Sequence, residues 1–146
     1  ESLLNVEGLV SVCHKLGTTH TGALIVIERS VPLDFVIATG DKMNLELSGP
    51  IIESIFYKNS PLHDGAIVIR GNTIVATRVI LPVAAEDTLP KHYGLRHRAA
   101  VSITEKTDAT ALVVSEETGH ISYFKNGNFV RFANEEELIK MIQEDN

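Results

Sequence analysis

Three short clusters of polar residues in this chain could carry out chemistry on a ligand. The first is LHDGA, residues 62–66, in which His63 and Asp64 are neighbours and two small residues follow. Imidazole and carboxylate groups both bind divalent cations, and small residues let a bulky ligand approach the backbone. The alternative interpretation is an ordinary turn in which Asp64 hydrogen-bonds its own backbone. The spacing of these residues leaves both interpretations open.

The second cluster is GLRHRAA, residues 94–100, at the start of an expected helix. Helix N-termini bind anions through free N–H groups and the helix dipole, and the guanidinium groups of Arg96 and Arg98 match the geometry of phosphate. Two positive side chains in a first turn oppose the helix dipole, so a bound anion would offset their cost. The alternative is a solvated helix face on which these arginines pair with glutamates.

The third cluster is SEETG, residues 115–119, directly after the apolar run ALVV. The carboxyl ends of strands in α/β proteins often border ligand crevices. A serine hydroxyl there could bind phosphate, and the carboxylates of Glu116 and Glu117 could bind a metal ion. The alternative is a polar turn closed by Gly119.

The elements that must position these clusters follow from hydrophobic periodicity and capping residues. An apolar stripe at helical spacing over residues 2–16 predicts a first helix that ends at Gly17. Ser48 is a good N-cap for a helix over residues 48–57. The other elements expected in this half are strands over 22–28 and 43–47 and a short helix over 33–38.

The second half alternates short strands with two helices. Asn126-Gly127 between alternating runs is a strong hairpin signal, and Asn134 with Glu137 imitates a capping box at the start of a last helix. The expected elements are a loop over 59–64, strands over 65–70 and 73–81 around a turn at 71–72, a loop over 82–91, a helix over 94–103, strands over 110–115, 121–124 and 129–132, and a helix over 134–145. The interleaving predicts an α/β fold with a mixed parallel/antiparallel twisted sheet and flanking helices.

Length and composition are those of one ordinary globular domain. The chain has 146 residues, of which 44% are hydrophobic and 22% charged, and no linker divides it. We expect a single domain made of an N-terminal helix (1–17), a core that bears the three clusters (20–132) and a C-terminal helix (134–145). The single cysteine, Cys13, excludes an internal disulfide and is expected in the core.

Charge and motif content narrow the classes of function. The formal net charge of −6 argues against a broad nucleic-acid-binding face. The sequence contains no P-loop, no G-x-G-x-x-G fingerprint, no H-E-x-x-H motif and no G-x-S-x-G elbow. The sequence contains no run of 18 apolar residues, which is about the length that a membrane-spanning helix needs. Because the sequence starts at Glu1, we expect it to be a piece of a longer protein.

Taken together, the three clusters resemble the diadenylate cyclase (DAC) domain, the catalytic unit of cyclic di-AMP synthases. Asp64-Gly65-Ala66 matches its DGA motif, Arg96-His97-Arg98 its RHR motif, and SEETG follows in the expected order. The run GALIVIER, residues 22–29, resembles the first core strand of that family. The resemblance covers about residues 20–132, and LHDGA and SEETG look most like the membrane-anchored type.

The resemblance implies an enzyme that converts two ATP into cyclic di-AMP and two pyrophosphates. Each 3′-hydroxyl would attack the α-phosphate of the other ATP, with Mg²⁺ or Mn²⁺ as cofactor. Each subunit would hold one ATP, so two copies would have to meet face to face as a homodimer. No nucleic-acid partner is expected. The domain would be cytoplasmic, with a membrane contact only through a segment of the parent protein absent from this chain.

The resemblance also assigns roles to individual residues. Asp64 would lie near the 3′-hydroxyl and the metal, with His63 and Glu117 as further metal ligands. Arg96 and Arg98 would clamp the phosphates. The other implied nucleotide contacts are Gly65, Ala66, Leu81, Gly94, Leu95, His97, Ser115 and Glu116.

Two positions depart from the family pattern. Leu95 stands where a threonine often precedes RHR, so one phosphate contact is lost or replaced. Ile80, on the expected adenine side together with Leu81, replaces an aromatic residue seen in some relatives. Two alternatives therefore stay open: a module that binds a nucleotide without turning it over, and a metal-dependent nucleotide hydrolase using His63, Asp64 and Glu117.

Overall fold

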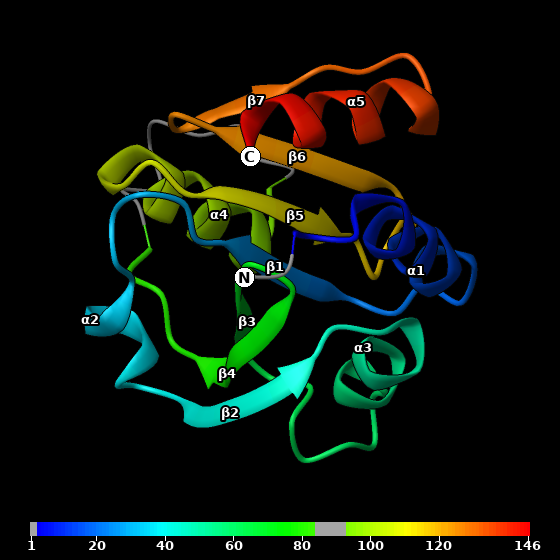
Figure 1. Cartoon of the computed structure of the whole chain (residues 1–146). Coiled ribbons are helices and arrows are strands. Elements are labelled where there is room, and N and C mark those ends of the chain that lie inside the picture. Colours follow the sequence, from blue (N-terminus) through cyan, green and yellow to red (C-terminus); the bar gives the residue numbers. More distant parts are fainter. Residues whose placement is uncertain (1–2, 84–92) are drawn as a thin grey trace.

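The structure, a computed structural model, describes residues 3–83 and 93–146. Strands and helices alternate along the chain (Figure 1). The helices are α1 (Val6–Thr18), α2 (Asp34–Ile37), α3 (Gly49–Phe56), α4 (Leu95–Lys106) and α5 (Glu135–Asp145). The strands are β1 (Ala23–Ile27), β2 (Asp41–Glu46), β3 (Ala66–Arg70), β4 (Thr73–Val79), β5 (Thr110–Val114), β6 (Ile121–Lys125) and β7 (Asn128–Val130).

The strands form one 7-stranded sheet in the order β2-β4-β3-β1-β5-β6-β7. Strands β1 and β3 are parallel, and the other neighbouring pairs are antiparallel. The chain between β1 and β3 contains α2, β2 and α3, which gives it the length that a parallel connection needs. The prediction of a mixed sheet with flanking helices in a single α/β domain is confirmed.

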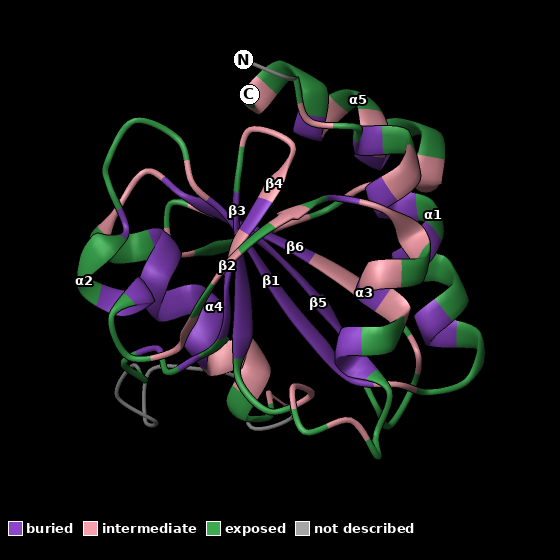
Figure 2. Cartoon of the chain, turned by 60° about the horizontal axis from the view of Figure 1, so that its bottom comes forward, coloured by how far each residue is buried: buried purple, intermediate pink, exposed green. Residues whose placement is uncertain are grey.

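Helices cover both faces of the sheet, which is why its central strands are apolar throughout. Alternate residues of a strand point to opposite faces. Ala23, Ile25 and Ile27 of β1 join the core under α1, α3 and α5, whereas Leu24 and Val26 join the core under α2 and α4. Figure 2 shows the buried strands as a central layer between these two groups of helices.

Caps and turns fix most element ends close to the predicted positions. The side chains of Ser48 and Asn134 accept hydrogen bonds from the N–H groups of Ile51 and Glu137, which confirms both as N-caps. Asn126 and Gly127 have φ of 54° and 77°, the left-handed pair of a two-residue hairpin loop. The thiol of Cys13 lies in the core, and burial raises its pKa to about 12.

The structure corrects several predicted boundaries. Helix α1 starts at Val6, capped by the Asn5 side chain, and runs through Gly17 to Thr18. A glycine at that position therefore did not end the helix; its role is a close approach to Gly119, whose carbonyl oxygen would lie 2.3 Å from a Cβ on Gly17. Strand β4 ends at Val79 rather than at residue 81. Helix α4 continues to Lys106, and β7 covers only Asn128–Val130. Most of the predicted loop over 82–91 lies outside the described residues.

Candidate active site

The sheet brings the three polar clusters to one edge. Ile25 pairs with Ile67 across β1 and β3, and Ala23 pairs with Val114 across β1 and β5. Extending both registers places Gly22 between Asp64 and Ser115. Because β5 runs antiparallel to β1 and β3, its carboxyl end meets their amino ends. SEETG follows the carboxyl end of β5, as the sequence indicated. LHDGA reaches the same edge of the sheet from the amino end of β3.

Arg96 links two of the clusters through a close contact with Gly22. A Cβ built on Gly22 would lie 2.5 Å from Cζ of Arg96, so the guanidinium rests against the backbone at the start of β1. Nη1 of Arg96 also lies 3.4 Å from Oε1 of Glu116. The Arg96 side chain is only 28% exposed. This guanidinium is thus fixed between the first residue before β1 and the loop after β5.

A pocket of about 660 Å³ opens beside Arg96. Its size is that of a site for a nucleotide-sized ligand. It is lined by seven residues that the sequence singled out: Gly94, Leu95, Arg96, His97, Ser115, Glu116 and Glu117. Eight further residues line it: Tyr93, Val113, Val114, Thr118, His120, Ser122, Phe129 and Arg131.

Residues of β6 and β7 in this pocket were missed, although the sequence held a signal for them. A two-residue loop at Asn126-Gly127 fixes the hairpin register, in which Phe124 pairs with Phe129. Continuing that register pairs Ser122 with Arg131 on the same face. The alternation of the hairpin could therefore have placed Phe129 and Arg131 beside the predicted site.

The N-terminus of α4 forms one wall of the pocket. Its N-cap is Gly94, and no side chain of residues 3–83 or 93–146 caps the helix. The first turn of a helix is a general binding site for anions. The His97 ring stacks on Tyr93 at a centroid distance of 5.3 Å. Nε of Arg98 donates a hydrogen bond to the Tyr93 carbonyl at 3.2 Å. Within RHR, Arg96 and His97 thus line the pocket, whereas Arg98 is not among its lining residues and secures the chain that enters the helix.

The loop after β5 is both a turn and a wall of the pocket. Oγ of Ser115 accepts hydrogen bonds from the N–H groups of Glu117 (3.1 Å) and Thr118 (3.2 Å). Gly119 closes the turn with φ of 77° and donates its N–H to the Ser115 carbonyl at 2.8 Å. The turn and the site that the sequence presented as alternatives are therefore compatible. The Ser115 hydroxyl proton is still able to point to a ligand oxygen.

In LHDGA, glycine is required by the neighbouring strand. Gly65 has φ of 86°, and a Cβ there would lie 2.8 Å from the carbonyl carbon of Arg78 and 2.9 Å from the Val79 oxygen. Arg78 itself has φ of 54°, at an irregularity between β3 and β4. Ala66 is fully buried in the core under α2 and α4. The small residues of this motif therefore fit the fold closely, which was not expected from the sequence.

His63 and Asp64 form a pair that could hold a cation. Nε2 of His63 lies 3.2 Å from Oδ1 of Asp64, and Nδ1 of His63 lies 2.8 Å from the Ser60 carbonyl. When Nδ1 donates its proton to that carbonyl, the lone pair of Nε2 faces the carboxylate side, as in many metal-binding histidines. The Asp64 side chain is 85% exposed and accessible to a ligand.

Glu117 does not complete a three-ligand site with this pair. No group of three histidine, cysteine, aspartate or glutamate side chains that could hold a metal occurs among residues 3–83 and 93–146. Mg²⁺ in nucleotide sites is commonly held by one or two carboxylates together with substrate phosphates. The donor set of His63 and Asp64 therefore fits an ion that a nucleotide would help to bind.

The two residues expected on the adenine side differ in exposure. Leu81 is 6% exposed and packs in the core under α2 and α4. Ile80 is 69% exposed, and its N–H donates to Oγ1 of Thr39 at 2.9 Å. Ile80 thus presents an exposed apolar side chain, whereas Leu81 is part of the core.

Comparison with known proteins identifies the family of this chain. Residues 10–129 match the DAC family model, described as DisA bacterial checkpoint controller nucleotide-binding. The chain belongs to the DAC family. A diadenylate cyclase of Listeria monocytogenes is 41% identical over 137 residues, which are 94% of this chain and 50% of that protein.

Solved structures of the family share the fold. The crystal structure of a double mutant of DacA from Staphylococcus aureus superimposes with a TM-score of 0.91 at 36% identity, covering 96% of this chain and 93% of that one. A Bacillus cereus structure described as a hypothetical membrane spanning protein gives a TM-score of 0.85 at 40% identity, covering 90% of this chain and 65% of that one. This DAC chain spans about half the length of the curated relatives it matches. No helix in the part of the chain that the structure describes is long and apolar enough to cross a membrane.

Proposed function

We propose that this DAC domain is a diadenylate cyclase, a nucleotidyltransferase that joins two ATP molecules into cyclic di-AMP and releases two pyrophosphates. The observation that carries the proposal is the contact of the Arg96 guanidinium with Gly22, at the edge where Asp64 and Ser115 also lie. Arg96 and Ser115 line the nucleotide-sized pocket, and Asp64 lies at the same edge of the sheet. Relatives named diadenylate cyclase and cyclic di-AMP synthase support the assignment.

The residues divide the work between binding and reaction. Arg96, at the N-terminus of α4, would bind phosphate oxygens and stabilise the charge that develops on them. Asp64 would lie beside the attacking 3′-hydroxyl and orient it or accept its proton. Ser115 would donate a hydrogen bond to a phosphate. Arg98 would complete the phosphate clamp from the same turn of α4.

His63 and Asp64 are the residues that would hold the metal ion, together with phosphate oxygens of a bound nucleotide. Bound Mg²⁺ or Mn²⁺ would neutralise phosphate charge and lower the pKa of the hydroxyl. The Nδ1–H of His63, donated to the Ser60 carbonyl, keeps its other nitrogen in position for that task. Because the Asp64 carboxylate is exposed, its rearrangement on nucleotide binding would cost little free energy.

The reaction requires a second subunit. We propose that two domains meet with their pockets face to face, so that each 3′-hydroxyl reaches the α-phosphate held by the other copy. Leu95, which lines the pocket, and Ile80, which follows β4, are 75% and 69% exposed and offer apolar surface for such a contact.

We further propose that the domain works in the cytoplasm as part of a longer protein that is anchored to the membrane. Its match to about half the length of its relatives supports the first point. The likeness to the Bacillus cereus protein described as membrane spanning supports the second.

The decisive experiment is incubation of the purified chain with ATP and Mn²⁺, and separately Mg²⁺, followed by anion-exchange chromatography with mass detection. We expect cyclic di-AMP and pyrophosphate in a ratio of one to two. AMP or ADP instead would show a hydrolase. Bound ATP with no product, in a sample proven dimeric by light scattering, would show a binding module.

Two substitutions test the assigned residues. Asp64→Asn and Arg96→Ala should each lower the rate of product formation by at least about 10²-fold, as loss of a catalytic carboxylate or charge donor commonly does. Asp34→Asn, also exposed but in the chain after β1, is the matched control and should keep its activity. Retained turnover in Asp64→Asn would refute its role in the reaction.

A further inference from the structure

The pocket lining includes a second arginine, Arg131, besides Arg96. Arg131 follows β7, and the hairpin register places it beside Ser122. Ser122 pairs with Val113, and Val113 pairs with Leu24. Directly paired residues on neighbouring strands point to the same face of a sheet. Since Leu24 and Val113 lie on the face covered by α4, Arg131 belongs to that face too, in agreement with its place in the pocket lining.

The two arginines of the pocket differ in their partners. Arg96 lies 3.4 Å from Glu116. Arg131 forms no ion pair with any residue that the structure describes, although its side chain is exposed and lines the pocket. The pocket therefore presents an uncompensated guanidinium at one end. A guanidinium binds the paired oxygens of a phosphate through parallel N–H groups.

Position decides which phosphate Arg131 can reach. The Arg96 guanidinium rests on Gly22, in line with β1, while Arg131 is in line with β7. Strands β5 and β6 lie between β1 and β7, so the backbones of β1 and β7 are three strand spacings, about 14 Å, apart. Both residues line the pocket that lies beside these strands. A polyphosphate tail whose reacting end lies at Arg96 and Asp64 would point its other end along β5 and β6 toward Arg131.

We propose that Arg131 binds the terminal phosphate of the nucleotide, the end that leaves as part of pyrophosphate, and that it makes the pocket prefer triphosphates to diphosphates. This inference rests on the proposed function of the pocket. A diphosphate lacks the group that reaches Arg131, so only the triphosphate gains the charge-assisted hydrogen bonds. The same contact would stabilise the pyrophosphate as negative charge develops on it.

The test compares the affinities of 3′-deoxy-ATP and 3′-deoxy-ADP, which bind but cannot condense because the attacking hydroxyl is absent. Isothermal titration calorimetry with Mg²⁺ would give both dissociation constants for the wild-type chain and for Arg131→Gln. We expect Arg131→Gln to weaken binding of 3′-deoxy-ATP about 10- to 100-fold, the equivalent of one charged hydrogen-bond pair. Binding of 3′-deoxy-ADP should change less than about 2-fold on the same reasoning.

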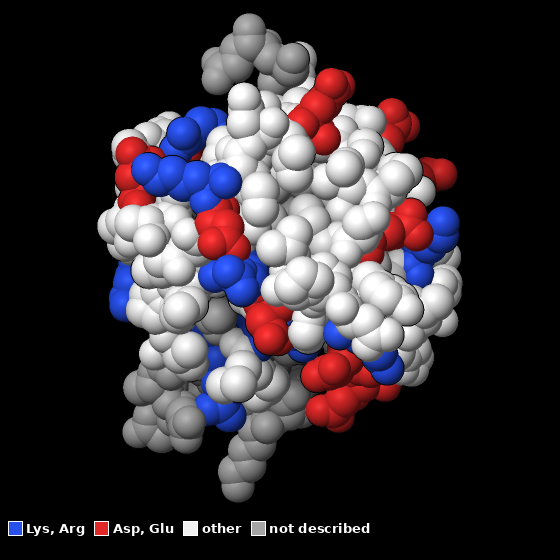
Figure 3. Space-filling model, turned by 90° about the horizontal axis from the view of Figure 1, so that it is seen from below, with Lys and Arg blue, Asp and Glu red and all other residues white. Residues whose placement is uncertain are grey.

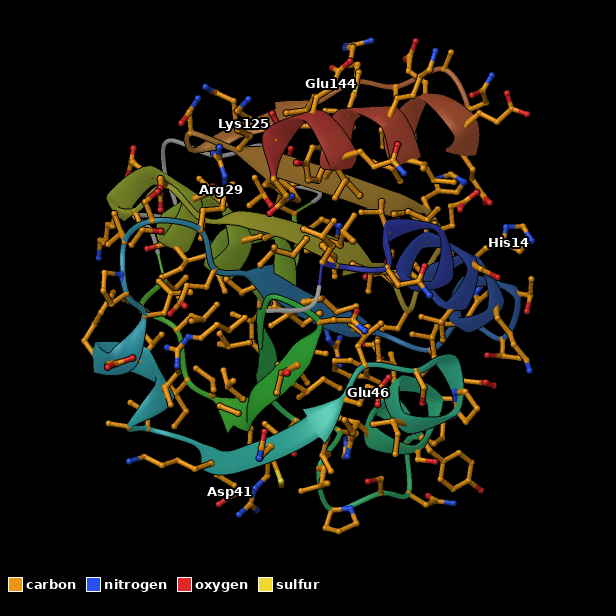
Figure 4. All side chains as sticks on the ribbon, viewed as in Figure 1. His14, Arg29, Asp41, Glu46, Lys125 and Glu144 are labelled. Carbon is orange, nitrogen blue, oxygen red and sulfur yellow. The ribbon has the colours of Figure 1, made fainter. Side chains whose placement is uncertain are left out.

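Two further variants sharpen the result. Arg131→Lys keeps the charge without the fork, so it should retain part of the preference for the triphosphate. Arg29→Gln is the matched control, because Arg29 is exposed at the opposite end of β1 (Figure 4). It should leave both affinities unchanged. Melting curves would verify that each variant is folded.

An unchanged ratio of the two affinities in folded Arg131→Gln would overturn the inference and leave the cyclase assignment intact. Equal weakening of both nucleotides would also overturn it, since a general electrostatic effect does not select the terminal phosphate. If wild-type protein binds both analogues yet makes no cyclic product from ATP, the proposed function fails, and the ratio still decides the role of Arg131.

Discussion

At the scale of single residues, the site depends on a glycine that carries no chemistry. Gly22 leaves room for the Arg96 guanidinium, whose atoms Cζ and Nη1 would both lie 2.5 Å from a Cβ added there. The guanidinium is at the end of a flexible side chain, so it could move aside at small cost in stability. Movement would take it away from the position where it meets Glu116 and the pocket.

Gly22→Ala should therefore reduce activity far more than stability. A displacement of about 1 Å in a positioning group can cost on the order of 10²-fold in rate, and we expect a loss of that size in cyclic di-AMP formation. Chemical denaturation should show a change of less than about 1 kcal/mol in the free energy of unfolding.

The control for this prediction is Gly49→Ala. A Cβ on Gly49 would meet its nearest neighbour, the Cβ of Val12, at 4.0 Å, so nothing has to move. This variant should keep full activity. If Gly22→Ala also keeps full activity, the observed position of Arg96 does not matter for the reaction.

At the scale of elements, helix α5 shows how local capping acts apart from the site. Oδ1 of Asn134 accepts the N–H of Glu137 at 2.9 Å, and Oε1 of Glu137 accepts the N–H of Ala133 at 2.7 Å. The predicted capping box is thus present, with its reciprocal bond going to the residue before the cap. The three glutamates that follow Asn134 add further stabilisation, because their negative charges lie at the positive end of the helix dipole.

Asn134→Ala should lower the free energy of unfolding by about 1 kcal/mol, the usual contribution of an N-cap. Urea denaturation followed by circular dichroism would measure it. Asn44→Ala, an exposed asparagine on β2, should change stability by less than about 0.5 kcal/mol. Product formation should be unchanged in both, because α5 does not line the pocket. A loss of activity on Asn134→Ala would mean that α5 communicates with the site.

The far ends of β1 and β3 are joined by a carboxylate with two tasks. Glu28 accepts hydrogen bonds from the Arg70 guanidinium, and its Oε2 also accepts the N–H of Leu33 at 2.8 Å, just before α2. The bond from Arg70 is the main reason that the pKa of Glu28 lies below its ordinary value. Its contribution to stability is complete above the pKa of the unfolded state and is lost as the pH falls through the lower, folded-state pKa.

Glu28→Gln should therefore flatten the acid side of the stability profile. The wild-type chain should be more stable than Glu28→Gln at pH 7, and the difference should shrink as the pH falls below about 4, near and below the ordinary glutamate pKa. Melting temperatures between pH 7 and pH 3 would measure it. A difference that stays constant across this range would contradict a role for the charge of Glu28.

At the scale of the whole molecule, each domain presents one proposed nucleotide site, whereas the proposed reaction consumes two nucleotides at once. Acidic and basic side chains are interspersed over a mostly uncharged face in Figure 3. The formal charge of −6 on each copy gives a mild repulsion between two of them. Assembly of the proposed dimer is therefore expected to be concentration-dependent.

Specific activity per subunit should rise with enzyme concentration and then reach a plateau. Light scattering on the same samples should show that the rise follows the change from monomer to dimer. An excess of the Asp64→Asn variant, mixed with wild-type protein, should lower the activity of the wild-type subunits because each mixed dimer contains one defective site. A specific activity that stays constant down to dilutions containing only monomer would refute the need for two copies.

The sequence alone determined the local elements and the family of this protein. Some local features depend only on residues a few positions apart, namely the caps at Ser48 and Asn134 and the Asn126-Gly127 hairpin. Such features can be predicted without knowledge of the fold. The apolar runs of β1, β3 and β5 likewise indicated a sheet that is buried on both faces. The motifs supplied the types of residue at the site.

Only the tertiary structure decided what each motif residue does in space. It set Arg96 on Gly22, turned Arg98 back to the Tyr93 carbonyl, and gave the space beside Gly65 to the backbone of β4. It also placed Arg131 in the same pocket as Arg96. These outcomes depend on strand register and helix docking between distant segments. Such contacts are fixed by the packing of the whole core, and short-range sequence patterns do not encode them.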